Sequence, residues 1–295
     1  MTDTPFERVA IVGFGLIGSS MARALRQTGL ARRIIGADSD PAVLGTVRDL
    51  DLADETTADM AVAVRGADLV VLATPIGSFR EIGAAIGPHL APGAIVTDTG
   101  SVKQAIIRDL APHIPESVHL VPGHPIAGTE HSGPGAGFAE LFHGRWCILT
   151  PLPQTDRPSV ERIAAMWRRF GMSLVEMDPV RHDKVLAITS HLPHLIAYTI
   201  VGTAIDLEDS LQSEVIKFSA GGFRDFTRIA ASDPIMWRDI FLNNREAVLE
   251  MLQRMTEDLV ALQRAIRWGE GDKLQDLFSR ARAVRRGVID AHQDK

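Results

Sequence analysis

A glycine-rich turn directly after a short apolar run constrains the fold of this chain more than any other feature. Residues 8–12 predict a buried strand, and residues 16–28 have helical spacing with Met21, Ala24 and Leu25 on one face. In such a strand–turn–helix unit, the first glycine allows the tight turn, the second lets the backbone approach a pyrophosphate, and the third lets helix and strand pack closely. The turn therefore predicts a dinucleotide site formed by Gly13, Phe14, Gly15, Leu16, Ile17 and Gly18.

The residues that follow the next strands refine this prediction. Asp38 ends a second predicted strand (33–36) and lies 20 residues beyond Gly18. A carboxylate there accepts hydrogen bonds from ribose hydroxyls and repels a 2′-phosphate, which favours NAD over NADP. Thr74 and Pro75 end a third strand (68–73), so we expect them to border the nicotinamide. Segments 98–103 and 123–128 are expected at the same edge.

Strands and helices alternate along the first part of the chain. Further strands are predicted at 94–97, 119–121, 147–149 and 173–176, with helices starting at Pro41 and covering 157–170. This alternation is typical of an α/β fold with a doubly wound, mostly parallel Rossmann-type sheet. After Asp178 only helices are predicted, at 180–205, 211–231, from Pro234, from Ile240 and at 273–288. We therefore expect a nucleotide-binding domain at 1–178 and an all-α domain at 179–295.

Composition narrows the possible functions. The chain has 295 residues, 45% hydrophobic and 23% charged, and a net charge of −6, which argues against nucleic-acid binding. Cys147 is the only cysteine, which excludes an intrachain disulfide and thiolate zinc clusters. The polar, acidic N-terminus predicts no signal peptide and a cytoplasmic protein. The uncharged run 185–205 is long enough to span a membrane, but it contains two histidines and Pro193, so we expect a fully buried helix and no membrane association.

His124 is the strongest candidate catalytic residue. It lies in the run Val121-Pro122-Gly123-His124-Pro125, at the strand edge where a nicotinamide is expected. Imidazole is a natural proton acceptor near neutral pH. The position predicts that His124 takes a hydroxyl proton while a hydride leaves the same carbon.

Two pairs of residues with helical spacing lie in the predicted all-α domain. Asp225 and Arg228 are three residues apart, so they can pair and form a rigid clamp for a carboxylate, although a structural ion pair has the same pattern. His191 and His194 also share a face, and without a third ligand they predict a polar pocket rather than a metal site. Pro193 leaves the carbonyl of Thr189 without its helical partner.

Other ionisable residues have no such context. The remaining histidines, His182 among them, fit surface or helix-capping positions. Lys103 fits a pocket charge and a surface group equally well.

Six separated segments together resemble the prephenate and arogenate (cyclohexadienyl) dehydrogenases of tyrosine biosynthesis. They are GFGLIG at 13–18, DTGSVK at 98–103, GHPIAG at 123–128 followed by Glu130, SHLPH at 190–194, GGFRDFTRIA at 221–230 and DPIMW at 233–237. The resemblance covers nearly the whole chain and implies NAD-dependent oxidative decarboxylation of prephenate, arogenate or both.

The resemblance also implies roles for individual residues. His124 matches the catalytic histidine, and Ser101 matches a serine that hydrogen-bonds it and approaches the nicotinamide. Arg228 matches the arginine that binds the ring carboxylate. Positions around the substrate pocket are matched by Asp225, His191, His194, Gly221, Trp237 and Glu130. The resemblance further implies a homodimer formed through the helical domain, which would cover the apolar helix 185–205.

Two alternatives stay open at this stage. The first is another two-domain NAD(P) dehydrogenase of the 3-hydroxyacid type, which would place a lysine on the helix that carries the SHLPH segment. The second is a non-catalytic NAD-binding sensor, which would need no aligned histidine, serine and arginine.

Overall fold

The structure is a computed structural model, and it describes residues 4–206, 214, 217–218 and 221–290. Its residues group into two compact units, 1–247 and 248–295. The first unit holds the nucleotide-binding sheet together with the helices up to the start of α12.

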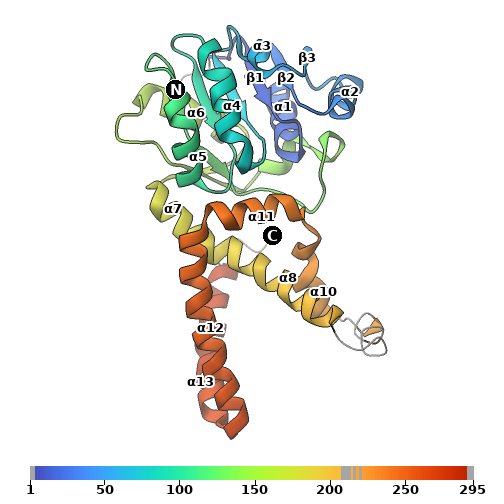
Figure 1. Cartoon of the computed structure of the whole chain (residues 1–295), viewed down its shortest axis with the longest axis vertical. Helices are drawn as coiled ribbons and strands as arrows, with labels where there is room; N and C mark the ends of the chain where they lie inside the picture. Colours follow the sequence, from blue (N-terminus) through green and yellow to red (C-terminus); the bar gives the residue numbers. More distant parts are fainter. Residues whose placement is uncertain (1–3, 207–213, 215–216, 219–220, 291–295) are drawn as a thin grey trace. The chain divides into compact units, whose positions relative to one another are not determined.

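A six-stranded parallel sheet forms the centre of the first unit (Figure 1). The strand order β3-β2-β1-β4-β5-β6 is that of the dinucleotide-binding fold, in which successive strands are added on one side of β1 up to β3 and on its other side from β4 onward. The strands are β1 (Val9–Val12), β2 (Ile34–Ala37), β3 (Glu55–Thr57), β4 (Leu69–Leu72), β5 (Ile95–Asp98) and β6 (His119–Val121). Five of them were predicted to within about a residue at each end. β3 was missed because its three residues are exposed or half-buried and form no apolar run.

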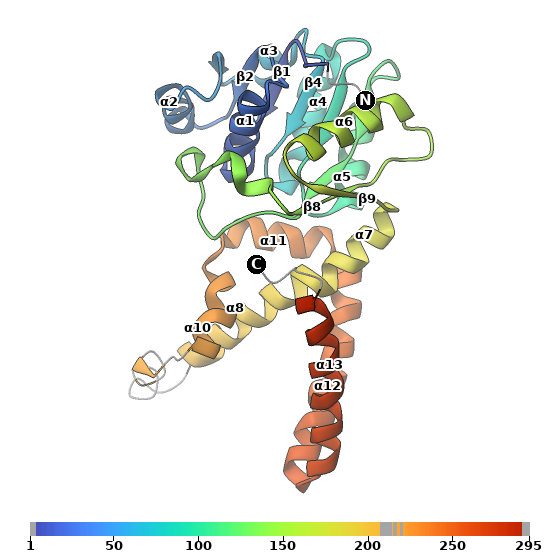
Figure 2. The same cartoon turned by 180° about the vertical axis from the view of Figure 1, so that it is seen from behind.

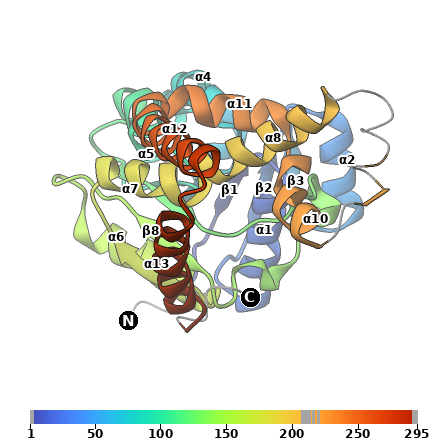
Figure 3. The same ribbon diagram turned by 90° about the horizontal axis from the view of Figure 1, so that it is seen from below.

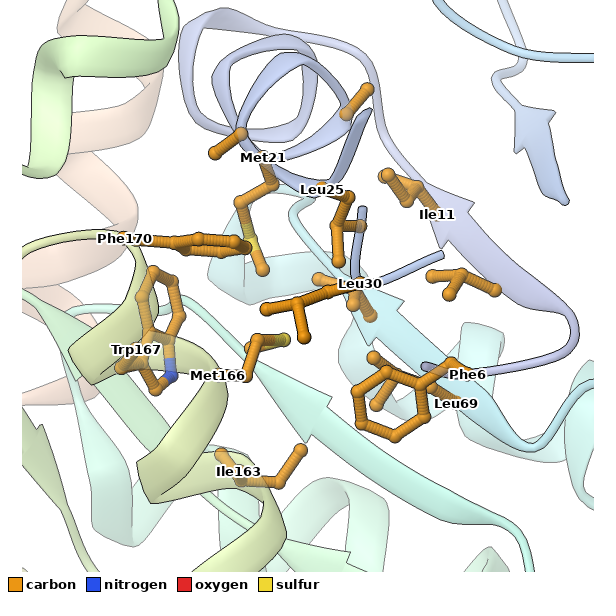
Figure 4. Packing of buried hydrophobic residues seen from close by; sticks show 14 of the residues in the cluster. Phe6, Ile11, Met21, Leu25, Leu30, Leu69, Ile163, Met166, Trp167 and Phe170 are labelled. Atoms are coloured by element: carbon orange, nitrogen blue, oxygen red, sulfur yellow. The ribbon is translucent and has the colours of Figure 1, made fainter. Parts of the chain in front are cut away.

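Helices cover both faces of this sheet. They are α1 (Leu16–Thr28), α2 (Pro41–Asp49), α3 (Met60–Val64), α4 (Phe79–Ile86), α5 (Lys103–Leu110) and α6 (Arg157–Arg169). Alternate residues of β1 point to opposite faces, so Val9 and Ile11 join one core cluster and Ala10 and Val12 the other. Figure 4 shows the first cluster, in which Trp167 and Phe170 of the α6 region pack beside Met21 of α1. The predicted helix α1 and the predicted start of α2 at Pro41 are confirmed, and the side chain of Asp40 caps α2.

A second, three-stranded sheet corrects the prediction of a single sheet. It contains β7 (Gly123–Pro125), β8 (Trp146–Leu149) and β9 (Ser173–Glu176), with β7 antiparallel to β8 and β8 parallel to β9. The sequence predicted β8 and β9 but placed them in the Rossmann sheet. β7 was not predicted as a strand, because glycine and proline at its ends are weak strand formers. It carries His124 opposite Ile148.

Helices dominate after residue 178, as predicted. They are α7 (Pro179–Leu186), α8 (Leu192–Ile205), α10 (Gly221–Thr227), α11 (Pro234–Asn243), α12 (Arg245–Trp268) and α13 (Gly271–Asp290). Figures 2 and 3 show α7 and α8 following one another along the chain. A π-helical turn (Ala187–His191) joins them just before Pro193, where the sequence predicted an interrupted helical bond. Asp178 and Asp233 cap α7 and α11. Of the helical region predicted at 211–231, most of the part before Gly221 lies outside the described residues.

The segment 185–205 is less buried than the sequence predicted. Within α8 only Leu192 and Ala197 are buried, and Ile200 and Ile205 are exposed. Among the described residues, α10, the turn after it and Trp237 of α11 contact this helix. Within the described residues, one helix, Pro179–Ile205, is long and apolar enough to cross a membrane by length and composition. The expectation of a fully buried helix was therefore wrong for the single chain.

Candidate active site

The turn between β1 and α1 has the geometry that the glycine motif predicts. Gly13 has φ +95°, and a Cβ there would lie 2.6 Å from the carbonyl oxygen of Ala73. A Cβ on Gly18 would overlap the carbonyl oxygen of Gly13, so this glycine allows the close packing of helix and strand. Apart from the neighbours of Gly15 in the chain, no described residue has a heavy atom within 4 Å of a Cβ added there, which leaves open space at the helix N-terminus. No described side chain caps that N-terminus, so its N–H groups are available to phosphate oxygens.

Asp38 lies at the carboxyl end of β2, beside this turn. Its carboxylate accepts hydrogen bonds from the backbone N–H groups of Phe14 at 2.9 Å and Asp40 at 3.0 Å. Thr74 and Pro75 follow β4, and the hydroxyl of Ser78 lies 3.1 Å from that of Thr74. The open cradle at Gly15, the uncapped helix and the acidic residue fit a dinucleotide with a pyrophosphate and a free ribose diol.

His124 lies on β7 and is buried, with its ring nitrogen Nδ1 2.8 Å from Nε2 of His182. Nδ1 of His182 lies 2.8 Å from a carboxylate oxygen of Asp183. An ionised carboxylate only accepts, so His182 donates from Nδ1 and, while neutral, accepts at Nε2. His124 then donates from Nδ1, and its own Nε2 is left as a proton acceptor.

The N-terminus of α5 holds Asp183 in place. The carboxylate of Asp183 accepts hydrogen bonds from the backbone N–H groups of Lys103 at 2.7 Å and Gln104 at 3.0 Å. Burial raises the pKa of Asp183, but the hydrogen bonds from His182 and from these backbone groups outweigh burial and leave the pKa below its usual value. Asp183 is therefore ionised at neutral pH and fixes the tautomer of His182.

A fully buried ion pair supports the strand on which His124 lies. Lys103 and Asp98 are both inaccessible to solvent and contact each other directly. Lys103 also donates to the carbonyl oxygen of Gly123, while Asp98 accepts from the N–H of Gly123 at 3.2 Å. Lys103 is thus a buried charge rather than a surface group, and the pair fixes both backbone groups of the residue before His124.

The surroundings of His124 keep it neutral. Burial lowers its pKa well below the usual value, and electrostatic interactions with His182, Lys103 and His191, which disfavour a positive charge on His124, lower the pKa further. A neutral imidazole can accept a proton at physiological pH, which is what a general base requires.

Ser101 is half-buried in the segment before α5, and no hydrogen bond joins it to His124 in the described part of the chain. Its contact with the catalytic histidine, which the family resemblance implies, stays a prediction. His182, expected at a surface or capping position, is instead the partner of His124. Its signal in the sequence was weak, because only the fold brings residue 182 next to residue 124.

His191, His194 and Trp237 form a second cluster. The rings of His194 and Trp237 stack with centroids 3.6 Å apart, and His194 donates from Nδ1 to the carbonyl of Ser190 at 2.9 Å. Trp237 on α11 is buried. His191 is fully buried and its Nδ1 contacts the amide of Asn244, a residue that the sequence analysis did not single out.

The predicted clamp between Asp225 and Arg228 is wrong. Arg228 pairs with Glu130 at 3.0 Å, and its side chain is 57% exposed. Asp225 lies on α10, 3.6 Å from Arg224. Arg228 begins a 3₁₀ turn (Arg228–Ala231) after α10 ends, so the α-helical spacing that would join the two residues is interrupted. Gly221 is the first residue of α10 and is half-buried. The structure thus brings Arg228 to Glu130, not to Asp225.

The fold and this site together define a class of protein. A dinucleotide-binding sheet whose carboxyl edge lies beside a neutral, buried histidine is the arrangement of an NAD(P)-dependent dehydrogenase. The exposed guanidinium of Arg228, which pairs with Glu130, adds a group that can bind acidic molecules.

Comparisons with known proteins define the class more narrowly. The prephenate dehydrogenase nucleotide-binding domain matches residues 21–176, and the prephenate dehydrogenase dimerization domain matches residues 178–280. Cyclohexadienyl dehydrogenase of Zymomonas mobilis is 41% identical over 98% of each chain. The chain therefore belongs to the prephenate dehydrogenase family.

Solved structures agree with this assignment. Prephenate dehydrogenase from Aquifex aeolicus, in complex with hydroxyphenyl propionate and NAD+, has a TM-score of 0.90 and 35% identity, covering 97% of this chain and 100% of that one. Arogenate dehydrogenase from Synechocystis has a TM-score of 0.79 and 27% identity, covering 95% of this chain and 99% of that one.

Proposed function

We propose that this enzyme oxidatively decarboxylates prephenate, arogenate or both with NAD, as a cytoplasmic step of tyrosine biosynthesis. One observation carries the proposal. His124 is buried, neutral and held through Nδ1 by His182 and Asp183, which leaves Nε2 as a proton acceptor near the carboxyl edge of the dinucleotide sheet.

The proton and the carboxylate are handled by this chain's own residues. NAD bound at the turn Gly13–Gly18 would supply the acceptor for the hydride of the substrate's carbinol carbon. His124 accepts the hydroxyl proton at Nε2, and the developing imidazolium is stabilised through His182 by the ionised Asp183. Loss of the ring carboxylate as carbon dioxide leaves an aromatic ring, which makes the step effectively irreversible.

The remaining site residues have proposed binding roles. Arg228 binds the ring carboxylate, because its exposed guanidinium has donors beyond the one that contacts Glu130. The substrate is bordered by six further residues, namely His191, His194, Trp237, Gly221, Asp225 and Glu130. Ser101 borders the nicotinamide. Gly13 to Gly18, Thr74 and Pro75 hold the cofactor, and Asp38 favours NAD over NADP.

We also propose that the enzyme is a homodimer formed through its helical domain. In the unit 248–295, only Val248 and Ala265 are buried hydrophobic residues among the described side chains. Ile266, Trp268, Phe278 and Val284 are exposed there. A helical pair with so little core needs a further surface to pack against, and a second copy supplies it. The match to a dimerization domain supports this.

The test is NADH formation by the purified protein with NAD and either prephenate or arogenate. Turnover of at least one substrate is expected, and the ratio of the kcat/KM values identifies the preferred substrate.

Two substitutions test the roles of single residues. His124→Asn should lower kcat at least about 100-fold, since general-base catalysis contributes about that much. Arg228→Gln should raise the substrate KM and leave that of NAD unchanged. NAD binding without turnover of either substrate would contradict the proposal.

A further inference from the structure

Asn244 lies directly after α11, and its buried side-chain amide donates hydrogen bonds to two acceptors. Its Nδ2 donates to the backbone carbonyl of Asp183 at 2.9 Å and lies 3.0 Å from Nδ1 of His191. A carbonyl oxygen can only accept, so the atom that faces it is the amide nitrogen. The Asp183 carbonyl therefore fixes the orientation of the Asn244 amide.

The tautomer of His191 follows from this orientation. The amide nitrogen offers only hydrogens, so Nδ1 of His191 accepts, and the neutral ring carries its proton on Nε2. Burial lowers the pKa of His191 to about 4, so the ring is neutral at pH 7. Its Nε2 is buried and has no hydrogen-bond partner within the described residues. A buried N–H without an acceptor is unfavourable, so this atom is a donor that lacks its oxygen.

The Nε2–H of His191 is linked through neighbouring side chains to His124, the proposed base. The ring of His191 meets Trp237 edge-on at a centroid distance of 6.0 Å, and Trp237 stacks on His194. Asp183 orients both sides of this group of side chains, since its carboxylate holds His182 and its carbonyl holds Asn244. As a result His124 presents an acceptor at Nε2, whereas His191 presents a donor at Nε2.

We propose that Asn244 is a positioning residue that sets His191 as a hydrogen-bond donor, through Nε2–H, to an oxygen of the substrate. The inference rests on the proposed function, whose substrates carry a ring carboxylate, a hydroxyl and a side-chain carboxylate. A neutral donor suits such a ligand because it adds no buried charge when the site is empty.

The donor is tested by two substitutions of His191. Glutamine keeps an N–H near the position of Nε2, whereas leucine keeps the bulk without a donor. His191→Leu should raise the substrate KM about 10-fold, the loss of one hydrogen bond, and His191→Gln should stay within about 3-fold of the unsubstituted enzyme. The dissociation constant of NAD should change in neither. Equal KM values for the two variants would overturn the proposal.

The role of Asn244 is tested by Asn244→Asp, whose carboxylate can only accept. Nδ1 of His191 must then carry the proton, and Nε2 loses it. The substrate KM should rise about 10-fold at pH 8 and recover as the pH falls, because the protonated ring carries hydrogen on both nitrogens. Asp183, His182 and His194 also face His191, so the control is Asn243→Asp, at a site bonded to the carbonyl of Asp239. A KM increase in Asn244→Asp that is independent of pH would indicate a purely structural role and overturn the proposal.

Nitrogen-15 NMR of histidine-labelled protein without substrate reports the tautomer directly. We expect protonated Nε2 in the unsubstituted protein and protonated Nδ1 in Asn244→Asp. Protonated Nδ1 in the unsubstituted protein would overturn the inference even if the enzyme turns over its substrate. Absence of turnover with protonated Nε2 would instead be a failure of the proposed function.

Discussion

At the scale of single residues, the neutral state of His124 has a consequence for the pH dependence of catalysis. A base acts only while unprotonated, so activity falls as the pH drops through its pKa. Burial and the neighbouring His182, Lys103 and His191 place that pKa well below its usual value. We therefore expect kcat to stay constant from pH 8 to below pH 6.5 and to fall only at lower pH. Steady-state rates with saturating substrate check this, and an acid limb at or above pH 6.5 would contradict it.

A second residue-scale prediction concerns the buried pair of Lys103 and Asp98. Lys103→Met leaves the Asp98 carboxylate buried without its partner, and breaking a buried pair on one side is strongly destabilising. We expect the free energy of unfolding to fall by about 3–5 kcal/mol, measured by urea denaturation. Lys273→Met, which removes an exposed pair with Glu270, should change it by less than about 1 kcal/mol. Similar losses in both variants would show that the buried pair has no special role.

At the scale of elements, two glycines of the β1–α1 turn have different roles. We expect Gly15 to be needed for NAD binding only, and Gly18 for both NAD binding and stability. Gly15→Ala meets open space in the free protein, so the melting temperature should stay within a few degrees. The added methyl group occupies the space of the pyrophosphate, so the dissociation constant of NAD should rise at least about 10-fold. Gly18→Ala clashes with the backbone of Gly13 and should lower both stability and affinity. Calorimetry measures both quantities, and equal affinity losses without any difference in stability would refute the assignment.

At the scale of the whole molecule, the exposed apolar residues of α12 and α13 are the surface that we propose a second copy covers. Phe278→Glu places a charge where the proposed dimer buries an aromatic ring, so it should shift the protein toward monomer. Gln275→Glu, at an exposed polar position of the same helix, is the matched control. Sedimentation velocity at micromolar concentration distinguishes the two, and a monomeric unsubstituted protein would contradict the dimer.

Local signals explain which parts of the structure could be predicted. Apolar runs predicted five strands of the Rossmann sheet, and the prolines Pro41 and Pro234 predicted the starts of α2 and α11. The edge strand β3 lacks an apolar run, and β7 is too short and too rich in glycine and proline for its sequence to reveal a strand. The pairing of Arg228 with Glu130, 98 residues apart in the chain, has no local signal at all.

The sequence by itself determined the dinucleotide turn, the doubly wound sheet, the helical second half and His124 as the candidate base, because each depends on residue type at short spacing. Only the tertiary structure decided the state of that base. His182, which Asp183 orients, reaches His124 from a helix that follows it by more than fifty residues, and Asn244 reaches His191 from the end of α11. Tautomers and pKa values depend on burial and on partners across the fold, so no local pattern in the chain specifies them.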